Sequence, residues 1–335
     1  MAANPKNMGK ILILFLITTF LMLLSLASLS IGPYTQVNIR DVIDYLTGGG
    51  TNNNIIRNII SYRLTRTISA VIVGAGLAAS GLTLQYILRN PLADPFLLGV
   101  SAGAALGVVI SQLVFGGKHL PALYTIALAS GLLGFMMVLF ISIFIGTSAT
   151  GLIIAGISVS YLLGGVSMIL IVKNADKIPG ALLWLFGTVA YTTKHELLYS
   201  SILTIISIII LIIYSKKINT LILGDDVSTS LGVDVNKLRI ISSAIASITA
   251  ASLVALAGPV GFIGLAGPWL ARLLVGSLYI KALITSLITG SMLLLSSDIT
   301  VRIIGGASEL PLTAITALYG GPILFYLTLK SMRGL

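Results

Sequence analysis

Residues 63–107, RLTRTISAVIVGAGLAASGLTLQYILRNPLADPFLLGVSAGAALG, decide the fold of this chain. Arg63 and Arg66 stand just before an uncharged run from residue 67 to 88, and the turn Asn90-Pro-Leu-Ala-Asp-Pro95 follows it. A second uncharged run with regularly spaced glycines begins after the turn. Since about 20 apolar residues span a bilayer as a helix, the stretch predicts two membrane helices joined by a proline-bracketed turn.

The composition places the whole chain in a lipid bilayer. Hydrophobic residues make up 56% of the 335 residues, charged residues only 9%, and the mean hydropathy is +1.06. A soluble domain carries about 25% charged residues, so we predict an all-α, polytopic membrane protein with a single transmembrane domain over residues 1–335. The net charge of +10 comes from bases that stand singly between apolar runs. Such residues anchor helix ends at lipid headgroups, and no basic patch with interleaved aromatic residues indicates a nucleic-acid partner.

Apolar runs predict about ten membrane helices. The first run, 11–31, is longer than the roughly 7–15 residues of a signal-peptide core. The 53 residues from Leu120 to Val172 carry no charge and must divide, and 146–151 is the only small, polar break in them. We expect helices at about 11–31, 67–88, 96–115, 120–145, 152–172, 197–214, 240–257, 260–276, 282–297 and 310–329.

Three parts of this plan are less regular. The segment 260–276 is a poor simple span, because Gly267-Pro268 interrupts it and Arg272 lies within it. The apolar segment 181–191 is too short to cross a bilayer and is expected to be re-entrant or interfacial. The connection from Gly32 to Tyr62 is polar and long, and the acids and bases of 218–239 predict a soluble loop with one or two short helices.

Glycine-rich motifs in the opening stretch predict helix packing. Gly74-Ala-Gly-Leu-Ala-Ala79 fits the dinucleotide fingerprint G-x-G-x-x-A, but that motif requires a strand before it and a βαβ unit around it. Neither is compatible with an uncharged membrane helix, in which small residues let neighbouring helices approach closely. Gly99, Gly103 and Gly107 recur every four residues and predict the same kind of packing.

The sequence contains no arrangement typical of catalysis. It has two histidines without an H-E-x-x-H motif, no cysteine, and no G-x-x-x-x-G-K-[ST] motif, so a zinc protease, a thiolate site and ATP hydrolysis by this chain are excluded. The predicted second to sixth helices carry almost no charge in their cores. Proton or sodium relays use charged residues at membrane depth, so the pattern disfavours an ion-coupled carrier.

Arg63, Arg66 and Arg302 have two interpretations. Arginines at helix ends commonly extend their guanidinium groups to the bilayer surface. Three arginines at two helix boundaries on one face could instead bind carboxylates bidentately. The sequence by itself leaves both interpretations open.

Motifs along nearly the whole chain resemble the FecCD permeases, the membrane subunits of ABC importers for iron–siderophores, haem and vitamin B12. The similar segments, in family order and spacing, are R-L-x-R at 63–66, S-G-x-x-x-Q at 80–85, R-N-P-L-A-D-P at 89–95, L-G-V-S-A-G at 98–103, L-G-D-D-V-S-T-S-L-G-V at 223–233, G-P-V-G-F-I-G-L-A-G-P at 258–268, D-x-x-x-R at 298–302, E-L-P-L-T-A-I-T-A at 309–317 and G-P-I-L-F at 321–325.

The resemblance implies the type II ABC-importer permease fold, with ten helices, inverted repeats and both termini in the cytoplasm. It implies a multi-pass protein of the cell membrane with no cofactor of its own. The expected partners are a second permease copy in a homodimer, two ABC ATPase subunits that bind MgATP, an extracytoplasmic substrate-binding protein and membrane lipid.

The resemblance also assigns residues to roles. It implies that Arg63, Arg66 and Arg302 bind acidic residues of the binding protein. It implies that the ATPase is coupled through a cytoplasmic loop of about 218–235, at Leu223, Gly224, Asp225, Asp226, Val227, Ser228, Leu231 and Gly232. It places the cytoplasmic gate at Thr147, Ser148, Ala149 and Thr150. Trp184-x-x-Gly187 resembles the family's short helix near the outer vestibule.

One position departs from the family pattern, because Trp269 stands where the family usually has a histidine after the proline. The rest of the pattern remains, so we expect a permease that moves an iron–siderophore or related metal chelate inward, with ATP hydrolysis on a separate subunit. Cobalamin or haem is the alternative cargo. An ion-coupled secondary transporter is the alternative class and would transport without an ATPase, and a membrane enzyme is disfavoured by the missing catalytic residues.

Overall fold

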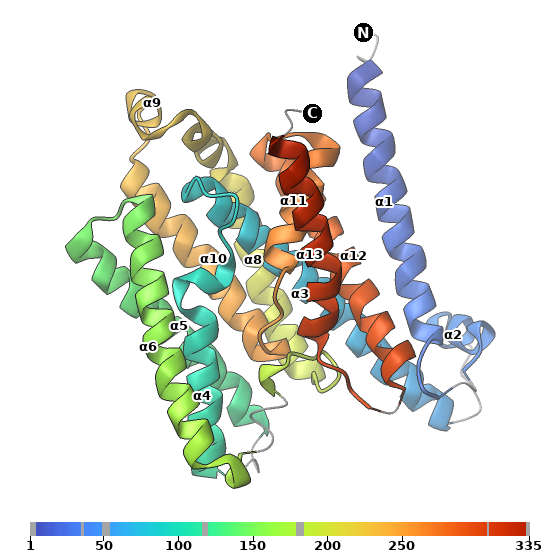
Figure 1. The fold of residues 1–335 in the computed structure, drawn as a ribbon. Coiled ribbons are helices and arrows are strands. Elements are labelled where there is room, and N and C mark those ends of the chain that lie inside the picture. Colours follow the sequence, from blue (N-terminus) through green and yellow to red (C-terminus); the bar gives the residue numbers. More distant parts are fainter. Residues whose placement is uncertain are drawn as a thin grey trace.

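The computed structural model describes residues 5–34, 37–48, 54–115, 120–178, 184–306 and 308–332, and every regular element within them is helical (Figure 1). The α-helices are α1 Pro5–Ser30, α2 Ile39–Leu46, α3 Asn54–Ile87, α4 Val100–Phe115, α5 Leu120–Ile145, α6 Ala149–Lys173, α8 Lys194–Thr220, α9 Asp225–Ser230, α10 Val235–Ala257, α11 Ile263–Val275, α12 Tyr279–Gly305 and α13 Leu312–Met332. The short 3-10 helices within the described ranges are η1 Pro95–Leu98, η2 Ala175–Lys177 and η3 Leu221–Leu223.

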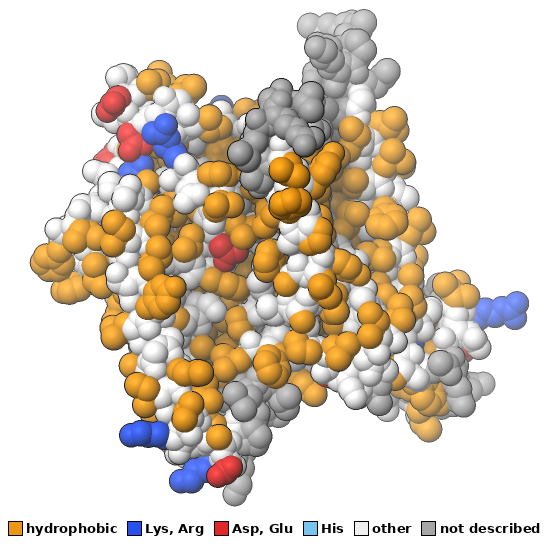
Figure 2. Space-filling view, in the orientation of Figure 1, with side chains coloured by type: hydrophobic (Ala, Val, Ile, Leu, Met, Phe, Trp, Pro, Cys, Tyr) orange, Lys and Arg blue, Asp and Glu red, His pale blue; other side chains and the backbone are white. Residues whose placement is uncertain are grey.

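Ten of the described helices correspond to the predicted membrane spans. α1, α3, α5, α6, α8, α10 and α12 are long and apolar enough to cross a membrane, and α4, α11 and α13 are shorter apolar helices. Figure 2 shows apolar side chains over most of the visible lateral surface, with most of the visible charged side chains toward the two ends. The prediction of an all-helical polytopic protein is confirmed.

Several helices extend beyond the ends that their charged residues predict, so those predicted ends are wrong. α8 continues through Lys216 and Lys217, and α12 continues past Asp298 and contains Arg302. α10 begins at Val235, where the Asp234 carboxylate accepts a hydrogen bond from the Lys237 amide at 3.0 Å, so the end of the predicted soluble loop is helical. A side-chain cap at the helix start, or a buried partner for a charge, lets a helix extend beyond its apolar run.

The polar connection of 32–62 is also more ordered than predicted. It contains α2, whose N-cap Asn38 forms a reciprocal capping box with Asp41, and the first turns of α3. α3 is therefore 34 residues long, and most of its residues after 66 are buried. It packs against α1, α8, α10, α11 and α12 and forms the centre of the bundle.

Small residues lie where helices cross, as predicted. A Cβ atom built on Gly74 would overlap the backbone of Gly290 in α12, and one built on Gly103 would overlap the carbonyl oxygen of Ser130 in α5. Side chains at these positions would force the backbones apart. The packing interpretation of the glycine motifs is confirmed at both crossings.

The doubtful span, 260–276, is a true helix, α11, and its proline is accommodated by a neighbour. Pro268 has no N–H, so the carbonyl of Gly264, four residues earlier, loses its intrahelical donor. Gln85 Nε2 of α3 donates to that carbonyl at 3.1 Å. The Gly-Pro motif therefore marks the crossing of α11 with α3 and does not break the helix.

The two ends of the bundle differ. The first turns of α1, the last turns of α13 and the short helix α9 lie toward one end, and α2 lies at the opposite end (Figure 1). Residues 181–183, the first part of the predicted re-entrant segment, lie outside the described residues. The described part does not span: the Thr188 amide donates to Ala257 at 2.7 Å and the Leu312 amide donates to Gly187 at 3.1 Å, which ties this segment to α10 and α13.

Candidate functional site: three groups along the helical bundle

Arg63, Arg66 and Arg302 gather where α1 ends, and each is only 3–5% exposed. Two of them contact main-chain carbonyls at the end of α1. Arg63 donates to the carbonyls of Leu29, Ser30 and Tyr34 at 2.7–3.0 Å, and Arg302 donates to the carbonyls of Ser28 and Ile31 at 2.8 and 3.1 Å. The last carbonyls of a helix have no intrahelical donor, so these guanidinium groups complete the end of α1.

Two carboxylates complete this arginine cluster. Arg66 contacts Asp298 at 2.8 Å and donates two hydrogen bonds to Glu309 at 2.7 and 3.1 Å. Arg302 also contacts Asp298, at 2.8 Å. Asp298 is 1% exposed, whereas the Glu309 side chain is 32% exposed.

The structure therefore brings the three predicted docking arginines together but does not leave their guanidinium groups open. Arg63 and Arg66 lie inside α3, not at its boundary as predicted. A buried guanidinium group requires partners for its donors, and this chain supplies carbonyls and carboxylates. Glu309 is the most accessible member of the described cluster, so a carboxylate arriving from outside would compete with it for Arg66.

The predicted coupling residues form a separate exposed element, η3 followed by α9. Leu223, Val227 and Leu231 recur every four residues and therefore share one face. They are 62%, 45% and 61% exposed. Ser228 is buried on the other side. Gly224 and Gly232 bracket α9 with φ angles of +109° and +80°, which favour glycine. An exposed apolar row on an otherwise hydrophilic segment is typical of a surface that binds a partner.

The predicted gate residues form the tight link between α5 and α6. Gly146 has a φ angle of +96°. Ser148 is the N-cap of α6 and accepts a hydrogen bond from the Gly151 amide at 3.0 Å. Ala149 and Thr150 are the first residues of α6. The break predicted at 146–151 is confirmed as a helix break, and its role as a gate stays a prediction.

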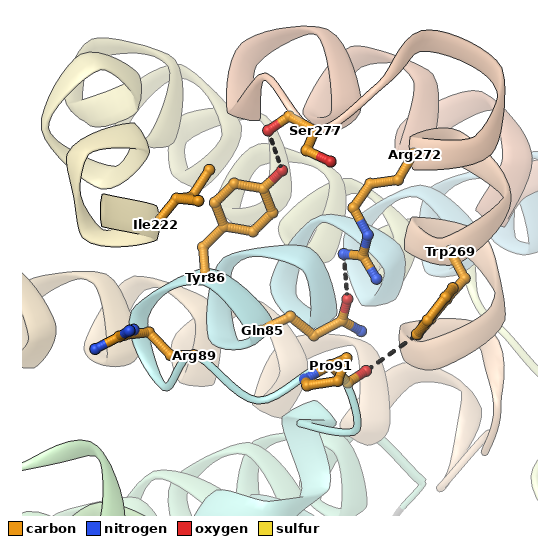
Figure 3. Close-up of a pocket in the computed structure, with 8 residues that line it drawn as sticks. All are labelled: Gln85, Tyr86, Arg89, Pro91, Ile222, Trp269, Arg272 and Ser277. Carbon is orange, nitrogen blue, oxygen red and sulfur yellow. Dashed lines mark hydrogen bonds between the residues drawn. The ribbon is translucent and has the colours of Figure 1, made fainter. Parts of the chain in front are cut away.

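A cavity of about 340 Å³ lies beside the coupling segment, between the end of α3, η3 and α11 (Figure 3). Figure 3 shows Arg272 pointing toward Gln85 and Trp269 pointing toward Pro91. Trp269 Nε1 donates to the Pro91 carbonyl at 3.1 Å, and the Arg272 guanidinium lies 5.1 Å from the Trp269 ring centre. Trp269 thus connects α11 to the turn after α3 through a donor that does not titrate.

Asp94, in the turn between α3 and η1 and outside the spanning helices, has an unusual environment. Burial raises the pKa of its carboxyl group to about 6, although the carboxylate accepts a hydrogen bond from the Phe96 amide at 2.9 Å. The folded protein therefore retains the Asp94 proton where the unfolded chain has lost it, and the resulting stabilisation disappears as the pH rises from 3.8 through about 6.

Replacing Asp94 with asparagine should remove this pH dependence. Asparagine retains an acceptor for the Phe96 amide but has no charge to bury, so we expect Asp94→Asn to melt higher than the wild type at pH 7.5 and by a clearly smaller margin at pH 4.5. Thermal unfolding in detergent at both pH values measures the difference. Equal shifts at the two pH values would contradict the assignment.

Three residues with central positions in these sites were not singled out from the sequence. Glu309 and Gln85 fell within family motifs but received no role. Arg239 was assigned to a soluble loop, yet it is 1% exposed and hydrogen-bonds to both Asp225 and the Thr147 carbonyl. The only signal in the sequence is an arginine directly before the apolar run that begins at Ile240, and that position also fits a surface residue.

Comparison with known proteins agrees with this architecture. The FecCD transport family matches residues 20–330. The cobalamin import system permease protein of Halobacterium salinarum is 36% identical over 79% of this chain and 71% of its own length, and the Fe(3+)-citrate import system permease protein YfmD of Bacillus subtilis is 32% identical over 95% of each. A solved metal-chelate type ABC transporter in an inward-facing conformation has a TM-score of 0.82 and 30% identity, covering 95% of this chain and 99% of that one.

Proposed function

The chain belongs to the FecCD transport family and is the membrane permease subunit of an ABC importer, and from this premise we propose its cargo, its partners and the surfaces they use. Translocation is not enzymatic, and ATP is hydrolysed by a separate subunit. We propose that the chain has no cofactor of its own and works as a homodimer in the cell membrane, with two ATPase subunits, a substrate-binding protein and both termini in the cytoplasm.

The proposed cargo is an iron–siderophore or a related metal chelate. Support comes from the similarity to the Fe(3+)-citrate permease and to the metal-chelate type transporter, while the similarity to the cobalamin permease keeps cobalamin as an alternative, with haem. Mass spectrometry of the binding protein co-purified with the permease should find an iron chelate. Finding a corrinoid or haem instead would refute the proposal that the cargo is an iron chelate.

The apolar row on the coupling segment supports the proposal that this surface binds the ATPase. Leu223, Val227 and Leu231 expose one apolar face at the end of the bundle that also contains the first turns of α1 and the last turns of α13 (Figure 1). That placement is consistent with both termini lying on the ATPase side. We propose that the ATPase buries this row, with Gly224, Asp225, Asp226, Ser228 and Gly232 shaping the segment.

Changing Val227 to aspartate should weaken ATPase binding. A charge at the centre of a buried apolar contact commonly costs about 2 kcal/mol or more, so we expect association to fall by about thirtyfold or more. Leu46→Asp is the matched control, because Leu46 is equally exposed, at 49%, but belongs to α2 at the opposite end. Co-purification at graded ATPase concentrations measures both, and unchanged association of Val227→Asp would refute the proposed surface.

We propose that the binding protein docks at the opposite end, over the arginine cluster. An acidic side chain of that protein would displace Glu309 from Arg66 and form the same bidentate contact. Reversing the charges of Arg63, Arg66 and Arg302 would also disrupt the end of α1, so Glu309→Gln is the gentler probe of this surface. The gate is proposed at Thr147, Ser148, Ala149 and Thr150, where α5 turns into α6.

A further inference from the structure

Arg239, near the start of α10, connects three segments that are far apart in the sequence. Its Nε donates to the carbonyl of Ile87 at 3.0 Å, and its Nη1 donates to the carbonyl of Thr147 at 3.3 Å. Its Nη2 donates to both carboxylate oxygens of Asp225, at 3.0 and 2.9 Å. One side chain therefore contacts the end of α3, the proposed gate and the proposed coupling helix.

The contacts of Arg239 with its three partners are rigid for chemical reasons. The guanidinium group is planar and presents its donors in a fixed geometry, and Arg239 is 1% exposed. Ile87 is the last residue of α3, so its carbonyl lacks an intrahelical donor. Hydrogen bonds from a charged donor are stronger than neutral ones. A movement of one partner therefore acts on the others through a buried group with little freedom to reorient.

Asp225 and Thr147, the two partners of Arg239 outside α3, lie in different surroundings. The Asp225 side chain is 45% exposed, and it lies in the first turn of α9, next to the apolar row. Among the described residues, Asp225 makes the only ion pair between α9 and the rest of the bundle. Thr147 lies in the short break that follows α5, and it contributes its main-chain carbonyl.

We propose that Arg239 is the positioning residue that transmits a displacement of α9 to the break between α5 and α6. The inference rests on the proposed function, in which the ATPase binds the row on the coupling segment. When α9 moves with the ATPase, the Asp225 carboxylate moves too. The Arg239 guanidinium group follows this carboxylate, because it is the strongest of its partners. The hydrogen bond from Arg239 to the Thr147 carbonyl therefore changes. A displacement caused by the ATPase is thus transmitted to the gate through one side chain and its hydrogen-bonded contacts with Asp225 and Thr147.

Arg239→Met tests the link directly, because methionine has a similar reach but no donors. The change leaves no buried charge unpaired, since Asp225 is partly exposed. Asp225→Ala is the second variant and breaks only the outer contact, so it keeps the test valid if Arg239→Met fails to fold. Lys237→Met is the matched control, because it removes an exposed cation from the same end of α10.

The readout is a spin label at the gate. The chain has no cysteine, so Thr150→Cys in the permease introduces the chain's single labelling site, on an exposed residue of the first turn of α6. The permease is assembled with a cysteine-free variant of its ATPase, at saturating ATPase concentration in lipid nanodiscs, and the label's spectrum is recorded with and without MgATP. The expected wild-type result is a spectral change on nucleotide addition, retained in Lys237→Met.

In Arg239→Met and in Asp225→Ala, the nucleotide-dependent change should fall at least about fivefold, the lower range of coupling between two sites. A purely structural role would lower the melting temperature but leave this response intact. A full response in either folded variant, or no response in the wild type, overturns the link. ATPase association is measured separately with Val227→Asp, so failure of the proposed ATPase surface is distinguished from failure of the link.

Discussion

Replacing Asp298 with alanine is expected to destabilise the folded permease by about 3–5 kcal/mol, the usual loss when one partner of a buried ion pair is removed. Asp298 is 1% exposed and contacts both Arg66 and Arg302 at 2.8 Å. Alanine would leave Arg302 with carbonyl and hydroxyl partners but no counter-charge, while Arg66 would retain Glu309 and the Tyr62 hydroxyl. The thermal unfolding midpoint of the purified protein should fall by several degrees.

Two further variants show whether the loss comes from the unpaired charge. Asp298→Ala combined with Arg302→Met removes both charges, and it should be more stable than the sum of the two single changes predicts. Asp176→Ala removes an exposed acid in η2 and should have little effect. If Asp298→Ala melts like Asp176→Ala, the buried arginine cluster does not stabilise the end of α1 as the structure indicates.

Gly81→Ala is expected to have the second large effect. A Cβ atom at Gly81 would overlap the carbonyl of Gly264 and lie 2.7 Å from its Cα, so the backbones of α3 and α11 would have to separate. Overpacking of this kind typically costs about 1–3 kcal/mol. The separation would also lengthen the hydrogen bond from Gln85 to the Gly264 carbonyl, which Pro268 leaves without its usual donor.

Gly164→Ala provides a control of opposite sign. Gly164 lies in α6 with no atom within 4 Å of a built Cβ, so alanine there should be neutral or stabilising by up to about 1 kcal/mol, the difference in helix propensity. The two variants are compared by thermal unfolding in the same detergent. Equal melting temperatures for Gly81→Ala and Gly164→Ala would show that the α3–α11 crossing is not closely packed.

The features predicted well from the sequence follow from local composition. Uncharged runs of sufficient length predicted the spanning helices, since a helix satisfies its own backbone polar groups in lipid. The small polar residues of 146–151 predicted the break between α5 and α6. Glycine spacing predicted close helix contacts, although the partner of each glycine, such as Gly290 for Gly74, could not be named.

The features predicted poorly depend on contacts between distant residues. Charges in the sequence predict helix ends, yet Asp298 and Arg302 lie inside α12 because Arg66 and the carbonyls at the end of α1 pair with them. Pro268 predicts a possible interruption, but Gln85 supplies the missing donor from another helix.

The sequence by itself determined that this chain is a helical bundle in a membrane, which segments span that membrane and which family the chain resembles, because composition and motif spacing are local properties. Only the tertiary structure decided which polar groups meet inside the bundle. The three arginines became a buried cluster, and Arg239 moved from a predicted surface loop to a buried contact between α9 and the gate. The physical reason is that burying a charge is costly without partners, and the partners come from helices that are far apart in the chain.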